Sequence, residues 1–103
     1  MKIKIILTTT NSDKTANDIS EYLVKENFSP CVHIRNNIQS VYTWKGKLEK
    51  SSEILLYIKT IPENVDNCKK LILKYHNYDV PEIVVTDAEI LNDAYRDWFI
   101  ENI

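Results

Sequence analysis

The feature that most constrains this fold is a pair of long runs of strand-forming residues between 31 and 60, separated by Gly46, the single glycine in 103 residues. Glycine accepts the positive φ of a tight turn at little cost, so Trp44 to Lys47 is expected to form a hairpin tip. The second arm, 47–60, would extend roughly 45 Å. A domain of about 100 residues has a diameter of only about 34 Å. The hairpin is therefore predicted to project beyond its own domain.

The remaining segments alternate between strand and helix patterns. A bend is expected in the first hairpin arm around Asn36 and Asn37. Two right-handed βαβ crossovers then give an α+β, ferredoxin-like βαββαβ fold with a C-terminal helix, in which one antiparallel sheet carries two helices on one face. The whole chain, 1–103, is expected to form one domain. Besides the hairpin, the predicted elements are strands 2–7 and 80–90, a first helix within 9–28 that begins at Ser12 or Asp13 as its N-cap, and helices within 60–76 and 91–103.

Composition and charge weigh against two classes of partner. The net charge is −2 and the isoelectric point about 5.6, so the chain lacks the basic surface that binds nucleic acid. Its apolar runs are too short to span a bilayer, and Met1 leads into a strand pattern without a signal-peptide profile. We therefore expect a cytoplasmic protein with no nucleic-acid or membrane partner, in which Cys31 and Cys68 remain free thiols.

Two strand segments are apolar over almost their whole length. Residues 53–59 and 82–85 read as strands covered on both faces, whereas the two helices cover one face only. A two-stranded overhang is also marginal in water by itself. We therefore expect a homo-oligomer in which sheets pack face to face and each hairpin reaches a neighbour. The alternative is a monomer whose hairpin kinks and folds back.

Several motifs with fixed spacings occur along the chain. The central one is Ser-x-Tyr-x-Trp-x-Gly-Lys-x-Glu at residues 40–49, followed by Glu53 and Lys59-Thr60. Others are Cys31 after the first helix, "YHNYDVPEI" at 75–83 and "YRDWF" at 95–99. Together these motifs resemble the CutA family, the divalent-cation tolerance proteins, over essentially the whole chain. The resemblance implies a homotrimer similar in form to the PII signalling proteins, with clefts between subunits and a role in tolerance of copper and other divalent cations.

The resemblance also implies copper ligands, and this chain retains only some of them. Relatives credited with copper binding carry a cysteine on the first strand and a His-His pair after the second helix. Here the corresponding residues are Thr8 and Tyr75-His76, so only His76 remains as a ligand at these positions. Cys31 and His33, two residues apart on a strand, project from one face and can supply further ligands for Cu²⁺.

A second group of polar residues is expected near the intersubunit cleft, where it would bind a divalent cation or a small anionic ligand. Carboxylates can accept hydrogen bonds or bind a hard cation, and a lysine can attract an anion. The alternative is an ion-pair network that sets the register of the trimer. This group consists of Lys47, Glu49, Glu53, Lys59, Tyr78 and Glu82.

Aromatic side chains are expected to hold the trimer together. Trp44 would anchor the hairpin against a neighbour, with stacking on a ligand as the alternative, and Tyr42 and Trp98 would join it at the interface. No nucleophile with a base, phosphate loop or metalloprotease motif is visible, so we do not expect an enzyme. Two functions remain: a metal-binding or ligand-binding tolerance protein, and a PII-like module that acts through an unidentified protein partner.

Overall fold

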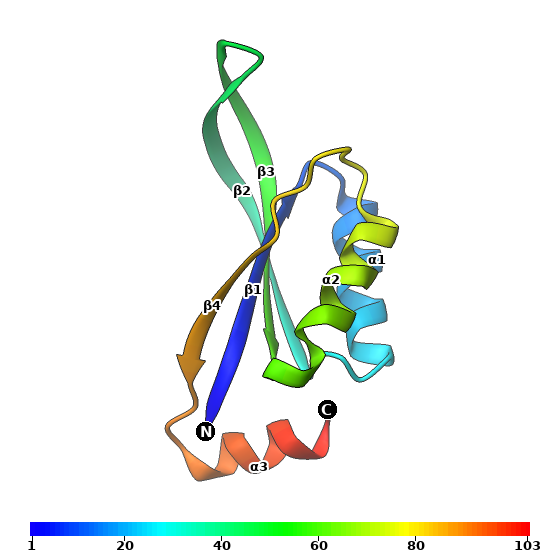
Figure 1. Cartoon of the computed structure of the whole chain (residues 1–103), viewed down its shortest axis with the longest axis vertical. Coiled ribbons are helices and arrows are strands. Elements are labelled where there is room, and N and C mark those ends of the chain that lie inside the picture. The colour runs from blue at the N-terminus through cyan, green and yellow to red at the C-terminus, as the bar shows by residue number, and fades with distance from the viewer.

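The computed structural model describes residues 1–103, and its elements follow the predicted βαββαβα order. The four strands form one antiparallel sheet in the order β2-β3-β1-β4, which confirms the ferredoxin-like fold. Figure 1 shows α1 and α2 side by side against the sheet and α3 across its lower end. The elements are β1 (Lys2–Thr10), α1 (Asp13–Lys25), β2 (Cys31–Trp44), β3 (Lys47–Thr60), the 3-10 turn η1 (Pro62–Asn64), α2 (Val65–Tyr75), β4 (Val84–Glu89) and α3 (Asp93–Glu101).

Local sequence explains where the two packed helices begin. The Ser12 hydroxyl accepts a hydrogen bond from the Thr15 amide at 3.1 Å, which caps the N-terminus of α1. Before α2 the chain first makes the 3-10 turn η1 at Pro62, whose fixed φ suits the first turn of a helix. The second helix therefore starts at Val65, a few residues later than the sequence pattern predicts.

The main core lies between these helices and the sheet. Alternate residues of β3, namely Ile54, Leu56 and Ile58, point toward the helices and are buried there. They meet apolar residues at helical spacing on α1 and α2, which fixes how both helices lie on the sheet. The buried helix residues of this core are Ala16, Ile19, Leu23, Cys68, Leu71 and Ile72.

The expectation that helices cover only one face of the sheet needs a correction. A second core forms on the opposite face, where Phe99 of α3 packs with Ile3, Ile5 and Ile90 and is completely buried. The C-terminal helix thus covers the end of the sheet that is farthest from the hairpin tip. Tyr57 and Val84 remain exposed on that side of the sheet.

The hairpin projects as the sequence predicts. β3 pairs with β1 only from Ile54 to Thr60, so its first half pairs with β2 alone and leaves the body as a two-stranded ribbon (Figure 1). The molecule is accordingly elongated, with extents of 47 × 24 × 22 Å. The predicted bend is also confirmed, because the register of β2 shifts between Arg35 and Ile38 and Asn37 has a φ of 61°.

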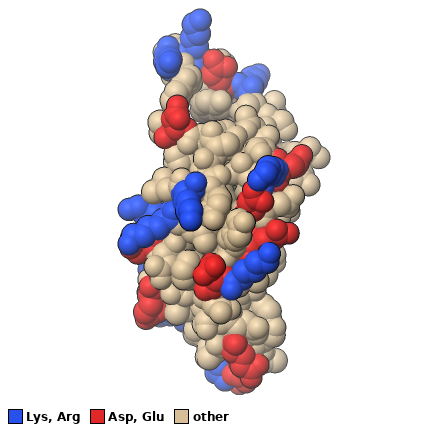
Figure 2. All heavy atoms as spheres, turned by 90° about the vertical axis from the view of Figure 1, so that its right-hand side faces the viewer, with Lys and Arg blue, Asp and Glu red and all other residues tan.

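Charges of both signs are mixed on the helical side of the molecule, as Figure 2 shows. Several of them form ion pairs along a helix, including Lys14 with Asp18 and Lys70 with Asp66. No continuous basic surface of the kind that binds nucleic acid is visible on this face. No helix combines the length and the apolar content that crossing a membrane requires.

Candidate functional site

A cleft of about 670 Å³ lies where the hairpin leaves the body. One wall is the hairpin itself, and the other is the connection between α2 and β4, drawn in yellow and orange in Figure 1. The end of β1 and the residue that follows it complete the site. The lining residues are Thr9, Asn11, Ser40, Val41, Tyr42, Trp44, Ser51, Glu53, Tyr78, Asp79, Val80 and Glu82.

The two walls are joined by a hydrogen bond between Tyr78 and Glu53. The Tyr78 hydroxyl donates to Oε2 of Glu53 at 2.7 Å, and Glu53 is only 8% exposed. Burial, together with this bond to a carboxylate, raises the pKa of Tyr78, so the phenol keeps its proton. No hydrogen bond or ion pair within the chain engages the second carboxylate oxygen, Oε1.

His76 fixes the start of the connecting segment. Its Nε2 lies 2.9 Å from the carbonyl oxygen of Thr9, and its Nδ1 accepts a hydrogen bond from the Tyr78 amide at 3.1 Å. An imidazole that donates from Nε2 and accepts at Nδ1 is neutral. Burial lowers the pKa of His76, which agrees with that state, although the bond to Thr9 and the charge of Glu53 oppose the shift. His76 therefore positions Tyr78 over the cleft.

The cleft is acidic and aromatic. Three carboxyl side chains line it, from Glu53, Asp79 and Glu82, and no lysine, arginine or histidine does. Two of its three aromatic side chains, Tyr42 and Trp44, are more than 40% exposed. Acidic groups and open ring faces both attract a positive charge, so the site is complementary to a cation.

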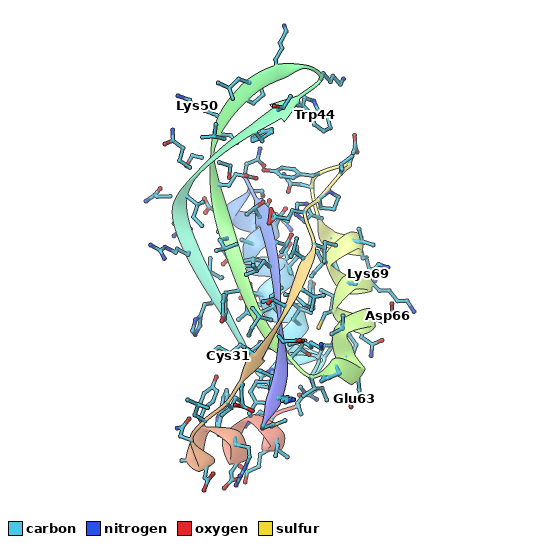
Figure 3. The ribbon with its side chains drawn as sticks, turned by 60° about the vertical axis from the view of Figure 1, so that its left-hand side comes forward. Cys31, Trp44, Lys50, Glu63, Asp66 and Lys69 are labelled. Carbon is cyan, nitrogen blue, oxygen red and sulfur yellow. The ribbon has the colours of Figure 1, made fainter.

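The three predicted metal ligands do not meet within one chain. Cys31 and His33 lie at the start of β2, and Figure 3 shows Cys31 far from the hairpin tip that carries Trp44. His76 lies at the other side of the body and uses both ring nitrogens in hydrogen bonds. No group of three or more His, Cys, Asp or Glu side chains is close enough to hold a metal ion.

The predicted cleft residues separate into three locations. Glu53, Tyr78 and Glu82 line the cleft together with Tyr42 and Trp44. Lys47 and Glu49 sit near the hairpin tip, opposite Trp44 and Tyr42 respectively.

Lys59 lies at the other end of the sheet. Its Nζ donates to the Tyr95 hydroxyl at 3.0 Å and lies 5.0 Å from the centre of that ring. Burial alone would lower the pKa of Lys59, but the bond to Tyr95 and the nearby Cys31 thiol outweigh burial and raise it. Trp98 stacks on the same Tyr95 ring at 5.5 Å. Lys59 of β3 and Trp98 of α3 thus both contact the Tyr95 ring, away from the cleft.

Thr8 and Cys68 are two buried residues whose surroundings decide whether they could bind a metal. Thr8 faces the helices, is completely buried, and is the only residue with a buried side-chain polar atom that lacks a hydrogen-bond partner. Cys68 lies on the buried face of α2, where burial raises the pKa of its thiol to about 11. A protonated, inaccessible thiol is a poor metal ligand and a poor nucleophile, so Cys68 acts as a core residue.

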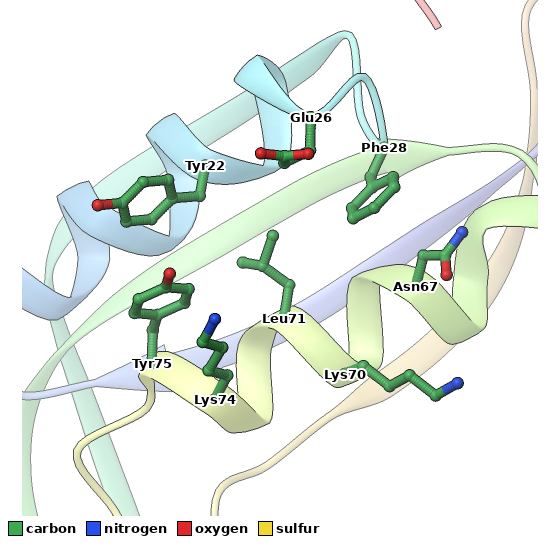
Figure 4. A pocket seen from close by; sticks show the side chains of 8 residues that line it. All are labelled: Tyr22, Glu26, Phe28, Asn67, Lys70, Leu71, Lys74 and Tyr75. Carbon is green, nitrogen blue, oxygen red and sulfur yellow. The ribbon is translucent and has the colours of Figure 1, made fainter.

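A second hollow, of about 410 Å³, lies between α1 and α2. Figure 4 shows Tyr22 and Tyr75 facing each other at one end of it and Phe28 at the other end, with Leu71 between them. The two tyrosine rings stack at 4.7 Å. Because the aromatic faces already contact each other and none of the lining polar side chains is buried, this hollow is a weaker candidate than the acidic cleft.

Sequence reasoning missed part of the cleft. Asp79, Ser51 and Asn11 line it but were not predicted. Ser51 could have been found from the alternation of β3, since residues two apart share a face of a strand and Glu53 was a candidate. Asn11 had no such signal, because its place beside the segment after α2 depends on a bond between its side chain and Asn77 at 2.7 Å.

Fold and site together define a ferredoxin-like subunit with a projecting hairpin and an acidic, aromatic cleft at the hairpin's base. Solved structures share this fold over nearly the whole chain. A divalent cation tolerance protein from Thermus thermophilus superimposes with a TM-score of 0.90 at 34% identity, covering 99% of this chain and 98% of that one. CutA from Xylella fastidiosa gives a TM-score of 0.92 at 30% identity, covering 98% and 97%.

Sequence comparison leads to the same family. Residues 4–102 match the model of the CutA1 divalent ion tolerance protein. The divalent-cation tolerance protein CutA of Thermus thermophilus is 34% identical over 99 residues, 96% of each chain. The Xenopus laevis CutA homolog is longer: at 37% identity, 84% of this chain matches 58% of that protein. The chain belongs to the CutA1 divalent ion tolerance family. The family's name describes tolerance, not a catalysed reaction.

Proposed function

We propose that this chain supports tolerance of divalent cations as a subunit of a homotrimer, and that the cleft at the base of the hairpin binds the cation. The observation that carries the proposal is the buried Glu53, whose free carboxylate oxygen belongs to a cleft that contains no basic side chain. A buried carboxylate without a positive partner is costly, and a bound cation would remove that cost.

The lining favours a cation over the small anionic ligand that the sequence also allowed. Binding an anion requires arginine, lysine or a cluster of amide donors, whereas the charged groups here are three carboxyls. Hard divalent cations accept such oxygen ligands together with water. Because these carboxyls do not converge on one point, a metal ion would bind weakly and keep several waters.

Copper has a second place to bind. It prefers nitrogen and sulfur ligands, and Cys31 and His33 supply one of each from the same face of β2. One chain offers only this pair, but a three-fold axis would present three copies of it. His76 is less suited, since a metal would have to displace one of its two hydrogen bonds.

Assembly is supported by the exposed apolar side chains of the projecting ribbon. Val41 and Leu48 are 57% and 71% exposed on the hairpin. An isolated two-stranded ribbon with such side chains is marginal in water, so a second copy packed against it would stabilise it.

The test is native mass spectrometry of the untagged protein, first alone and then with Cu(II), Zn(II) or Mn(II). We expect a trimer that gains metal mass, and calorimetry should give a dissociation constant that rises at least tenfold in Glu53→Gln. Glu63→Gln, which removes the same charge from the exposed turn η1, is the matched control and should bind like the parent.

Each alternative gives a different result. Copper binding that survives Glu53→Gln but is lost in His33→Ala would move the site to β2. Loss of metal binding in His76→Gln and in no other variant would place the metal site at the segment after α2. A trimer that ignores all three metals would refute the cation site and leave the PII-like interaction module, while a monomer would refute the assembly.

A further inference from the structure

The ring faces and carboxyls of the cleft are arranged for more than a metal ion. Tyr42 and Trp44 come from the hairpin, and Tyr78 comes from the opposite wall. The carboxyls of Glu53, Asp79 and Glu82 line the same cleft but do not form a group that could hold one metal ion. The negative charge is therefore distributed along the cleft.

Distributed charge selects the kind of cation. A single small ion reaches full stabilisation only where several oxygens converge on it. A chain that carries several amino groups, separated by short methylene segments, can instead place one ammonium near each carboxyl. Its methylenes and ammonium groups would also pack against aromatic faces, where a cation is attracted by the ring quadrupole.

From this arrangement, and resting on the proposed function of the cleft as a cation site, we propose that the cleft binds a linear aliphatic polyamine. Its terminal ammonium donates to Oε1 of Glu53, while the chain lies across the rings of Trp44 and Tyr42. The other amino groups then lie beside Asp79 and Glu82.

Glu53 is the residue that distinguishes this site from a patch of surface acids. It is more than nine-tenths buried, and the Tyr78 hydroxyl fixes its Oε2 at 2.7 Å. The Oε1 atom of Glu53 has no hydrogen bond within the chain. It is nevertheless not fully enclosed, because the only fully enclosed side-chain polar atom without a partner is the Thr8 hydroxyl oxygen. Oε1 is therefore still accessible from the cleft. A preorganised acceptor with one open oxygen is a specific docking point for an ammonium group.

The cleft also has the size and the hydrogen-bonding groups that such a ligand needs. Its volume of about 670 Å³ falls within the usual range of small-molecule sites. Ser40, Ser51 and Asn11 add hydroxyl and amide oxygens to the lining, and these can accept from secondary amino groups. No lysine or arginine competes for the carboxyls in the cleft.

Isothermal titration calorimetry with spermidine, at physiological ionic strength and on the assembled protein, tests the proposal. We expect saturable binding of one spermidine per chain. Glu53→Gln keeps a partner for the Tyr78 hydroxyl and should weaken binding at least tenfold. Trp44→Leu removes a ring but no charge and should weaken it several-fold, whereas Glu63→Gln should change nothing.

Fluorescence gives an independent measure, since Trp44 and Trp98 are the only tryptophans. In Trp98→Phe the remaining emission comes from Trp44, and spermidine should change it with the same dissociation constant. Spermidine binding that Glu53→Gln and Glu63→Gln weaken equally would be non-specific attraction to an acidic protein and would overturn the inference.

Metal titrations in parallel separate this inference from the proposed function. Metal binding that depends on Glu53 without any spermidine binding would overturn the polyamine site and leave the cation site standing. If neither ligand binds, the cleft is not a cation site, and both proposals fall together. Spermidine binding without metal binding would support the polyamine site and refute the metal ion as the ligand of this cleft.

Discussion

Thr8 and Thr10 are neighbours on the same face of β1, and both are completely buried, yet their hydroxyls differ. The Thr8 hydroxyl has no hydrogen-bond partner. The Thr10 hydroxyl donates to Oδ1 of Asn77 at 2.5 Å and accepts from the Ser12 amide at 3.2 Å. A buried polar group without a partner destabilises the fold, whereas one that is bonded on both sides supports it.

We therefore expect Thr8→Val to raise the free energy of unfolding by about 1 kcal/mol, since valine keeps the shape and removes the unpaired hydroxyl. Thr10→Val is the matched control and should lower it by about 1 to 2 kcal/mol. Urea unfolding at one fixed protein concentration measures both, because assembly contributes to stability. Equal effects of the two changes would show that the Thr8 hydroxyl has a partner.

The hydrogen bonds of His76 predict how stability depends on pH. Burial is the main cause that lowers the pKa of His76 in the folded protein below its usual value near 6.5. The unfolded chain then takes up the proton first as pH falls, so the contribution of His76 to stability is complete above about pH 6.5 and declines below it.

We expect the free energy of unfolding to fall between pH 7 and pH 5 in metal-free buffer, with the decline reduced in His76→Gln. The variant loses the titrating group, although it also loses the fit of the imidazole between Thr9 and Tyr78. The slope against pH, not the absolute stability, is therefore the quantity to compare. Parallel slopes for parent and variant would contradict the assignment.

At the scale of a single element, the hairpin turn shows how two residues set the geometry of a long ribbon. Lys45 and Gly46 have φ values of 49° and 79°, the pair of positive angles that a type I′ turn requires. A side chain at Gly46 would meet no atom within 4 Å. Any cost of a substitution there is consequently a backbone cost and not a clash.

We expect Gly46→Ala to destabilise the turn by about 1 kcal/mol. Lys45→Asn should stabilise it, because asparagine followed by glycine is the preferred type I′ pair. Amide hydrogen exchange near the tip is the suitable measurement, since the outer ribbon pairs with no third strand and can open by itself. Unchanged exchange in both variants would mean that contacts between copies, and not the turn, hold the tip.

At the scale of the whole molecule, the exposed ribbon predicts assembly. Leu48 is 71% exposed on the hairpin and lies outside the cleft. We expect Leu48→Ser to raise the dissociation constant of the oligomer at least tenfold, whereas Leu73→Ser on the outer face of α2, where Leu73 is 49% exposed, should leave it unchanged. Light scattering across a dilution series measures both. If Leu48→Ser and the parent have the same mass at every concentration, the hairpin is excluded as an interface.

The order of elements, the place of the turn and the bend in β2 could all be predicted from the sequence, because each depends on local chemistry. The apolar run at residues 53–59 predicts a strand, and the structure buries Ile54, Leu56 and Ile58 on the face toward the helices. Gly46 marks the turn, and the two asparagines mark the bulge. The cleft residues Glu53, Tyr78 and Glu82 were accessible only through the family resemblance.

Tertiary structure alone decided what these residues do. Spacing along the chain could not show that α3 folds onto the second face of the sheet, or that Lys59 meets Tyr95 and not the cleft. It could not show that His76 has both nitrogens engaged. The physical reason is that secondary structure follows from neighbours in sequence, whereas the partners of a side chain are set by loops and crossovers that bring distant segments together.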